Sequence, residues 1–351
     1  MEERGGGEKD PARGRDGGER PRDERSVEEG TPSALEGHRS GIHFLSPNLR
    51  GEGDQLKAFS VWRATMPAMT SRPGYICDAA VQRSFMVNGI SLHALEWGQP
   101  GRPALCFLHG GSAHAHWFDA VVPAFVDRFH VISLDQRGHG ESGWAPDGKY
   151  GTEQFASDLR EVMDAMRWGR VVVVGHSMGG HNAMGFSAWY PDRVRGLCVV
   201  DSRPSLPAER LEAMHRRGHR GPRRHETLAA ALASFRLLPS ETTAAPELLA
   251  HLGRQGIAER DGRFLYRFDP NANGARRPVD GWALLPRIQA PTLLVRGGLS
   301  PIMPAEMADR MVTAIPNAKL VTIPGAYHHL VLDAPEAFTR LLDDFLRGLP
   351  D

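Results

Sequence analysis

The sequence predicts an α/β protein whose core is a doubly wound, mostly parallel sheet of eight strands. Four consecutive valines at 171–174 are typical of a central strand that is buried on both faces. Strand-like apolar segments alternate with helical patterns up to residue 203 and again after residue 286. Because this alternation is characteristic of parallel sheets, we expect the two parts of the chain to share one sheet.

The strands and helices follow one another in a regular order. Residues 84–95 contain two β-prone segments around Asn88-Gly89, a dipeptide preferred in two-residue hairpin turns. Six further strands are expected at 104–108, 130–134, 171–174, 197–201, 291–297 and 320–323. Helices are expected at 117–128, 152–167, 304–314 and 335–347, of which the last is amphipathic.

Two segments lie outside the alternating pattern. Residues 1–57 are rich in glycine and in charges of both signs and lack apolar periodicity, so they are predicted to form a disordered tail. Residues 81–203 and 286–351 are predicted to form the two parts of the core, with order beginning near residue 81. The intervening 204–285 is mainly helical in pattern, and an insertion at this point would form a lid over the carboxyl ends of the strands.

The lid carries an arginine cluster and several aromatic side chains. The cluster is most simply a solvated face, and the alternative is that the lid attracts an acidic substrate near Arg224 and Arg236. The aromatic residues favour a small-molecule substrate with an apolar acyl or alcohol portion. The clustered residues are Arg216, Arg217, Arg220, Arg223 and Arg224.

The overall composition argues against several classes of partner. The 42 basic and 42 acidic residues give a formal net charge of zero, so no global field favours nucleic acid or an anionic membrane. No apolar run approaches the ~20 residues of a membrane span, and the amino terminus lacks the apolar segment of a secretory signal. Cys106 and Cys198 lie in apolar runs and are expected to be buried thiols. We expect a cytoplasmic protein, and a homo-oligomer is not excluded.

The segment after the four valines fits the nucleophile elbow pattern G-x-S-x-G. The matching residues are Gly175, Ser177 and Gly179. A strand that turns at once into a helix forces its corner residue into a strained backbone conformation, and flanking glycines let the two elements approach closely. The Ser177 hydroxyl would then project at the amino terminus of the helix, where developing negative charge is stabilised.

Four motifs in this order resemble those of the α/β-hydrolase superfamily. They are His109-Gly110-Gly111, the stretch 135–142 (DQRGHGES), the elbow, and Pro324-Gly325-Ala326-Tyr327-His328. The resemblance covers about 81–349 and implies the α/β-hydrolase fold with a lid between strands six and seven. It also implies catalysis by a serine, a histidine and an acid, without a dissociable cofactor.

The resemblance assigns the triad residue by residue. Ser177 matches the nucleophile, and His328 matches the histidine in the loop after the last strand, with His329 as the alternative. Many members place the acid after strand seven, where this chain has Ser300, and others place it after strand six, where it has Asp201. A serine does not compensate the charge of an imidazolium, so Asp201 is predicted to be the acid. Weaker candidates on the following helix are Glu306 and Asp309.

The resemblance also suggests the groups around the nucleophile. The backbone amides of Gly111 and Met178 are expected to form the oxyanion hole. Gly110, Trp117 and His176 are expected to contact the substrate. Three histidines lie near one another in the sequence, at His109, His114 and His116. No metal site is expected there, because no carboxylate or cysteine joins them in a recognised ligand spacing.

The expected function is a carboxylesterase-like serine hydrolase that cleaves an ester or a related acyl bond through a covalent acyl-enzyme. Three other reactions on the same triad stay open: carbon–carbon bond hydrolysis of ring-cleavage products, lactone hydrolysis and cofactor-free haloperoxidation. The serine at the elbow argues against epoxide hydrolases and haloalkane dehalogenases, which use an aspartate nucleophile. A non-catalytic hydrolase-like binding protein is the alternative from a different class.

Overall fold

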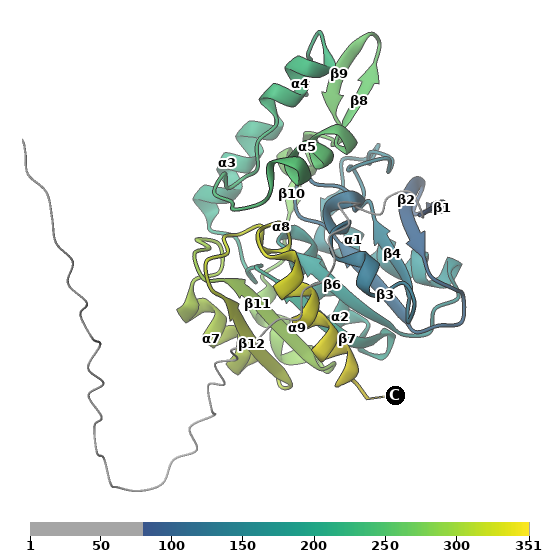
Figure 1. Cartoon of the computed structure of the whole chain (residues 1–351), viewed down its shortest axis with the longest axis vertical. Coiled ribbons are helices and arrows are strands. Elements are labelled where there is room, and N and C mark those ends of the chain that lie inside the picture. Colours follow the sequence, from purple (N-terminus) through teal and green to yellow (C-terminus); the bar gives the residue numbers. More distant parts are fainter. Residues whose placement is uncertain (1–79, 351) are drawn as a thin grey trace, which may run out of the picture. The chain divides into compact units, whose positions relative to one another are not determined.

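A computed structural model describes residues 80–350 of the chain, and the predicted tail at 1–57 lies outside this range. The described part is built on an eight-stranded sheet (Figure 1). Its strands, from one edge to the other, are β1 (Val81–Val87), β2 (Ile90–Trp97), β4 (His130–Leu134), β3 (Ala104–Leu108), β6 (Val171–His176), β7 (Val194–Val200), β11 (Thr292–Gly297) and β12 (Ala318–Ile323). The strands from β4 to β12 run parallel, and β1 and β2 pair antiparallel. The predicted fold class is confirmed.

Both faces of the sheet are buried, as the valine run indicated. Val171 and Val173 pack into one apolar core, whereas Val172 and Val174 pack into the other. The first core lies beneath α1 (Thr152–Ala165), α2 (Met178–Trp189) and α7 (Ala305–Ala314). The second lies beneath α8 (Leu330–Asp333), α9 (Pro335–Arg347) and the chain that follows β3.

Most elements lie where the sequence predicts them, and the helix expected at 117–128 is the exception. This stretch forms two short 3-10 helices, η1 (Ala115–Phe118) and η2 (Val122–Ala124). Pro123 lacks the N–H group that an α-helix needs at that position. Phe118, Val121 and Phe125 are buried at the i, i+3, i+7 spacing of one helix face, which is why the sequence pattern favours a continuous helix.

The insertion between β7 and β11 combines helices with short strands. Its helices are α3 (Ala208–Gly218), α4 (Leu228–Ser234), α5 (Pro246–Gln255) and the single-turn α6 (Asn271–Gly274). Between α5 and α6 lies an antiparallel pair of strands, β8 (Ile257–Arg260) and β9 (Arg263–Tyr266). Asp261-Gly262 turns this pair with φ of 52° and 68°, the conformation that an Asp-Gly hairpin requires. Sequence analysis missed this signal. Figure 1 shows the insertion at one end of the sheet.

A second short pairing attaches the insertion to the core. Strand β10 (Arg276–Arg277) pairs in parallel with β5 (Tyr150–Gly151), which directly precedes α1. The last part of the chain before β11 contains two further 3-10 helices, η4 (Gly281–Ala283) and η5 (Leu285–Arg287). Within residues 80–350, no helix is both long and apolar enough to cross a membrane.

Helix α2 lies unusually close to the sheet because two glycines face the neighbouring backbone. A Cβ atom on Gly175 would lie 2.4 Å from the carbonyl oxygen of Gly179. A Cβ atom on Gly179 would lie 2.2 Å from the carbonyl oxygen of Leu108 in β3. Both contacts are far inside van der Waals distance, so only glycine fits at either position.

We therefore expect Gly179→Ala to destabilise the protein by roughly 2–3 kcal/mol, the usual cost of overpacking a rigid site. The matched control is Gly169→Ala, because a Cβ atom on Gly169 meets nothing within 4 Å. The control should stay within about 0.5 kcal/mol of wild type. Chemical denaturation measures both variants, and equal stabilities would contradict the close approach of α2 to β3.

Candidate active site

Ser177 occupies the corner between β6 and α2. Its backbone angles are φ 52° and ψ −113°, a conformation that is costly for a residue with a side chain. The strain is held in place because the Ser177 N–H donates to the carbonyl of Val200 at 2.9 Å. The corner therefore lies directly beside the carboxyl end of β7.

The residues predicted as a triad lie within hydrogen-bonding distance of one another. The Nε2 atom of His328 lies 3.0 Å from the Ser177 Oγ atom. Its Nδ1 atom lies 2.7 Å from the Asp201 Oδ2 atom. His328 follows β12 and Asp201 follows β7, so three parallel strands deliver the three groups to one edge of the sheet.

Asp201 is buried and accepts hydrogen bonds from two elements besides the histidine loop. The Ser300 hydroxyl donates to its Oδ2 atom at 2.5 Å, and the Gly297 N–H donates to its Oδ1 atom at 3.1 Å. Burial raises the pKa of Asp201 to about 7, and these two donors oppose the shift. The serine that replaces the expected strand-seven acid thus supports the acid on the neighbouring strand. Sequence analysis did not predict this contact.

His328 is held as a neutral imidazole. Burial lowers its pKa well below the ordinary value, and nearby His329, Arg210 and Arg203 lower it further. A neutral ring that donates its Nδ1 proton to Asp201 presents an unprotonated Nε2 atom to Ser177. This arrangement suits a general base for the serine hydroxyl.

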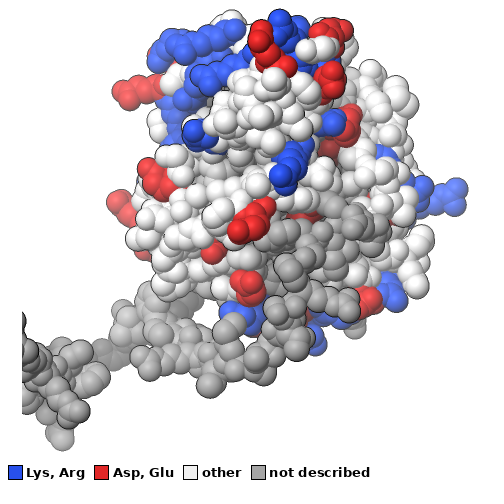
Figure 2. Space-filling view, turned by 45° about the horizontal axis from the view of Figure 1, so that its top comes forward, with Lys and Arg blue, Asp and Glu red and all other residues white. Residues whose placement is uncertain are grey.

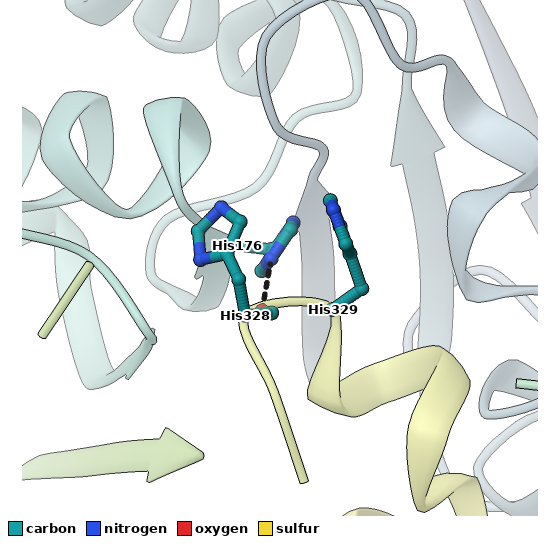
Figure 3. Close-up of side chains that lie close together, drawn as sticks. All are labelled: His176, His328 and His329. Atoms are coloured by element: carbon teal, nitrogen blue, oxygen red, sulfur yellow. Dashed lines mark hydrogen bonds between the residues drawn. The ribbon is translucent and has the colours of Figure 1, made fainter. Parts of the chain in front are cut away.

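Two other histidine side chains lie beside His328, as Figure 3 shows, and both bond to backbone carbonyls. His176 donates its Nε2 proton to the His328 backbone carbonyl at 2.9 Å. His329 bonds instead to the Pro239 carbonyl, 2.9 Å from its Nε2 atom. The geometry therefore favours His328 over His329 as the base.

A small cavity of about 140 Å³ opens above the serine. Gly111, Met178 and the triad residues Ser177 and His328 all line it. Three residues expected to contact the substrate do not line it: Gly110, Trp117 and His176. Trp117 is buried and stacks on the His176 ring with centroids 6.4 Å apart, so both rings support the site from behind. Larger hollows elsewhere on the described chain contain neither Ser177 nor His328.

The two amides expected to form an oxyanion hole are unused within the described part of the chain. Met178 is the first residue of α2, so its N–H has no partner inside the helix. Neither this N–H nor that of Gly111 donates a hydrogen bond to another described residue. Both groups border the same cavity as Ser177.

Two groups of side chains in the described range converge closely enough to hold a metal ion. In one of them, Asp119 Oδ2 lies 2.9 Å from His116 Nδ1 and 2.7 Å from His251 Nε2. The other consists of His176, His328 and His329. A metal in the second group would compete with Ser177 and Asp201 for His328.

The remaining histidines of the predicted loop bond to the backbone. His109 Nδ1 donates to the Gly110 carbonyl at 2.7 Å, while its Nε2 accepts the Gln136 N–H at 3.1 Å. His114 Nε2 lies 3.1 Å from the Leu252 carbonyl. Both rings are buried, and burial lowers their pKa values to about 3 and about 4, so they are neutral structural groups.

Arginines are the unexpected feature of the cavity lining. Four arginines border the cavity. Of the arginine cluster predicted in the lid only Arg217 is among them, and Arg224 and Arg236, where an acidic substrate was expected, do not line the cavity. An observable signal was the i, i+7 spacing of Arg210 and Arg217, which puts them on one helix face. The lining arginines are Arg203, Arg210, Arg217 and Arg276.

Comparison with known proteins agrees with the fold. Over 273 residues the chain is 29% identical to 2-(acetamidomethylene)succinate hydrolase of Mesorhizobium japonicum, covering 77% of this chain and 96% of that protein. It is 30% identical to a serine hydrolase-like protein of Danio rerio, covering 72% and 83% respectively. The crystal structure of E-2-(acetamidomethylene)succinate hydrolase superposes with a TM-score of 0.69 at 25% identity and covers 77% of this chain and all of that one. Residues 103–335 match the family model of the alpha/beta hydrolase fold, and the chain belongs to that family.

Proposed function

We propose that this hydrolase cleaves a carboxylic ester or a related acyl bond through a covalent acyl-enzyme on Ser177. The observation that carries the proposal is the continuous path from Ser177 Oγ to His328 Nε2, at 3.0 Å, and from His328 Nδ1 to Asp201, at 2.7 Å. A serine hydroxyl is a weak nucleophile until a positioned base accepts its proton. This path supplies the base and the carboxylate that orients it.

In the first half-reaction, Ser177 Oγ attacks the acyl carbon and its proton passes to His328 Nε2. The resulting oxyanion accepts hydrogen bonds from the Gly111 and Met178 amides, each worth about 3 kcal/mol in the transition state. Collapse of the intermediate breaks the bond to the leaving group, which takes the proton from Nε2. The acyl group stays on the serine.

In the second half-reaction, a water molecule attacks the acyl carbon and gives its proton to His328 Nε2. Collapse of this intermediate releases the acid and returns the proton to Ser177 Oγ. Asp201 stabilises the imidazolium in both steps without leaving its position at the end of β7. Water is thus the only reactant besides the substrate, and Ser177 and His328 return to their starting protonation states.

The names of relatives support hydrolysis of an acyl bond, and they differ in the kind of acyl bond. Several are named esterases, including one from Mycobacterium tuberculosis that is 30% identical over 280 residues. Another is named for the hydrolysis of 2-(acetamidomethylene)succinate. The proposal therefore covers esters and other acyl derivatives of small acids.

Labelling by a fluorophosphonate serine probe tests the nucleophile. Wild type should label, and Ser177→Ala should not label and should lose p-nitrophenyl ester turnover by roughly 10⁶. Asp201→Asn should lower kcat by roughly 10⁴, because the amide favours the wrong imidazole tautomer.

Asp309→Asn is the matched acid control, since Asp309 lies on α7 and does not line the cavity. It should label and turn over like wild type. A wild-type protein that neither labels nor hydrolyses the esters would leave a non-catalytic binding protein as the better explanation.

The acid limb of the pH profile tests the role of Ser300. Asp201 and His328 titrate as a coupled pair, and kcat/KM should fall as the pH drops through about 7, the raised pKa of Asp201. Ser300→Ala removes a donor to the carboxylate, which raises the pKa of Asp201 and moves this limb upward by about one pH unit. Ser187→Ala is the control, because the buried Ser187 hydroxyl has no partner among the described residues. A downward shift in Ser300→Ala would contradict the assignment.

A further inference from the structure

The side of the active-site cavity that faces the lid is positively charged. Four arginines line it and no aspartate or glutamate does. Figure 2 shows many basic side chains, with acidic ones among them, at the end of the molecule where Figure 1 places the insertion. An electropositive lining beside a nucleophile is a feature that a neutral, purely apolar substrate does not need.

Arg276 is the most informative of the four arginines. Its side chain is 5% exposed, yet it makes no hydrogen bond or ion pair with any other described residue. Burial lowers its pKa to about 10, so it stays charged at neutral pH. A buried charge without a partner is strongly destabilising, and such groups are ordinarily paired. None of its nitrogen atoms is among the fully enclosed, unpartnered atoms of the described chain, so the guanidinium is open to the cavity, where a bound anion would pair with it.

The position of Arg276 is fixed by the backbone on both sides. Strand β10 pairs with β5 of the core, and the Arg276 carbonyl accepts a hydrogen bond from His215 of α3 at 2.9 Å. The backbone of Arg276 is thus fixed beside the cavity, and a guanidinium carried there is suited to recognise a planar anion.

Arg210 and Arg217 add charge at the exposed rim of the same cavity. They lie on one face of α3 with Met214 between them, and neither pairs with a described carboxylate. Partial burial lowers the pKa of Arg210, and repulsion from the nearby positive charge of Arg217 lowers it further. By contrast, Arg216 on the other face of α3 lies 3.6 Å from Glu212.

Arg203 has a different role. Its Nε and Nη2 atoms donate to the carbonyl of Ile302 at 3.0 and 2.7 Å, so the side chain is already engaged in joining the lid entrance to the chain after β11. Three arginines therefore remain available to a ligand, with Arg276 innermost.

We propose that the substrate is a small acyl compound carrying a carboxylate, which pairs with Arg276 while Arg210 and Arg217 attract it at the rim. This inference rests on the proposed acyl hydrolysis at Ser177 and adds the substrate class. The cavity volume of about 140 Å³ limits the acyl part to a short chain. A guanidinium fork recognises a carboxylate through two parallel hydrogen bonds, which a methyl ester does not offer.

A pair of matched substrates tests the charge preference. One is p-nitrophenyl hydrogen glutarate and the other is its distal methyl ester, with spontaneous hydrolysis subtracted using Ser177→Ala. Wild type should prefer the free acid by roughly tenfold or more in kcat/KM, the effect of one charge-assisted pair. Arg276→Met should lose this preference through a loss on the acid ester alone. Arg210→Gln should weaken the preference, and the control Arg216→Gln should keep it.

Equal kcat/KM for the two substrates in wild type would overturn the substrate class while leaving the hydrolase proposal intact. So would an Arg276→Met variant that loses activity on both esters alike. The unfolding temperature of Arg276→Met separates binding from structure. Removing an unpaired buried charge should leave it unchanged or raise it, and a marked fall would assign Arg276 a structural role instead.

Ligand binding to the catalytically inactive Ser177→Ala protein tests the anion site without chemistry. Glutarate should raise its unfolding temperature, dimethyl glutarate should not, and adding Arg276→Met should abolish the effect. Protection by inorganic phosphate equal to that by glutarate would contradict a carboxylate site. If glutarate protects but no ester is hydrolysed by wild type, the anion site stands and the proposed hydrolysis fails.

Discussion

The close approach of α2 to the sheet is the constraint on which the candidate site depends. Without Cβ atoms at Gly175 and Gly179, the helix begins one residue after the strand ends, and Ser177 is pushed above the sheet edge in a strained conformation. The strain is supported by burial on both sides, because alternate valines of β6 anchor the strand in two separate cores. Positioning of the serine is therefore a property of the whole sheet, not of the five-residue turn.

The adjacency of β7 and β11 explains why Asp201, which follows β7, lies beside Ser300, which follows β11. Parallel neighbours end side by side, so side chains that follow the two strands lie close to one another. Here the carboxylate follows β7, and the position after β11 holds a hydroxyl that donates to it. The two positions are complementary in charge and hydrogen bonding, which is why a serine after β11 is compatible with an intact histidine–carboxylate pair.

Local signals in the sequence predicted much of the fold. The predictions failed where a proline or a pairing between distant segments determined the structure. The strands with β-branched runs and the Asn88-Gly89 hairpin were placed correctly because their signals are local. The helix expected at 117–128 was wrong: its buried residues keep a helical spacing, but Pro123 lacks the N–H group that a continuous α-helix needs there. Ser177, His328 and Asp201 were brought together by strand order, whereas Arg276 reaches the cavity only through the pairing of β10 with β5, for which the sequence carries no local signal.

The pairing of β10 with β5 also ties one part of the insertion to the core, and α3 is attached to that part through His215 and through its packing on α6. Arg276 belongs to a segment tied to the sheet-side chain just before α1, while Arg210 and Arg217 are carried by α3, whose outer surface is exposed. An outward movement of α3 would remove two positive charges from the rim and would also break the hydrogen bond from His215 to the Arg276 carbonyl. Substitution of the exposed arginines of α3, which leaves the helix and His215 in place, would then alter the admission of a ligand without disturbing the orientation of the bound molecule.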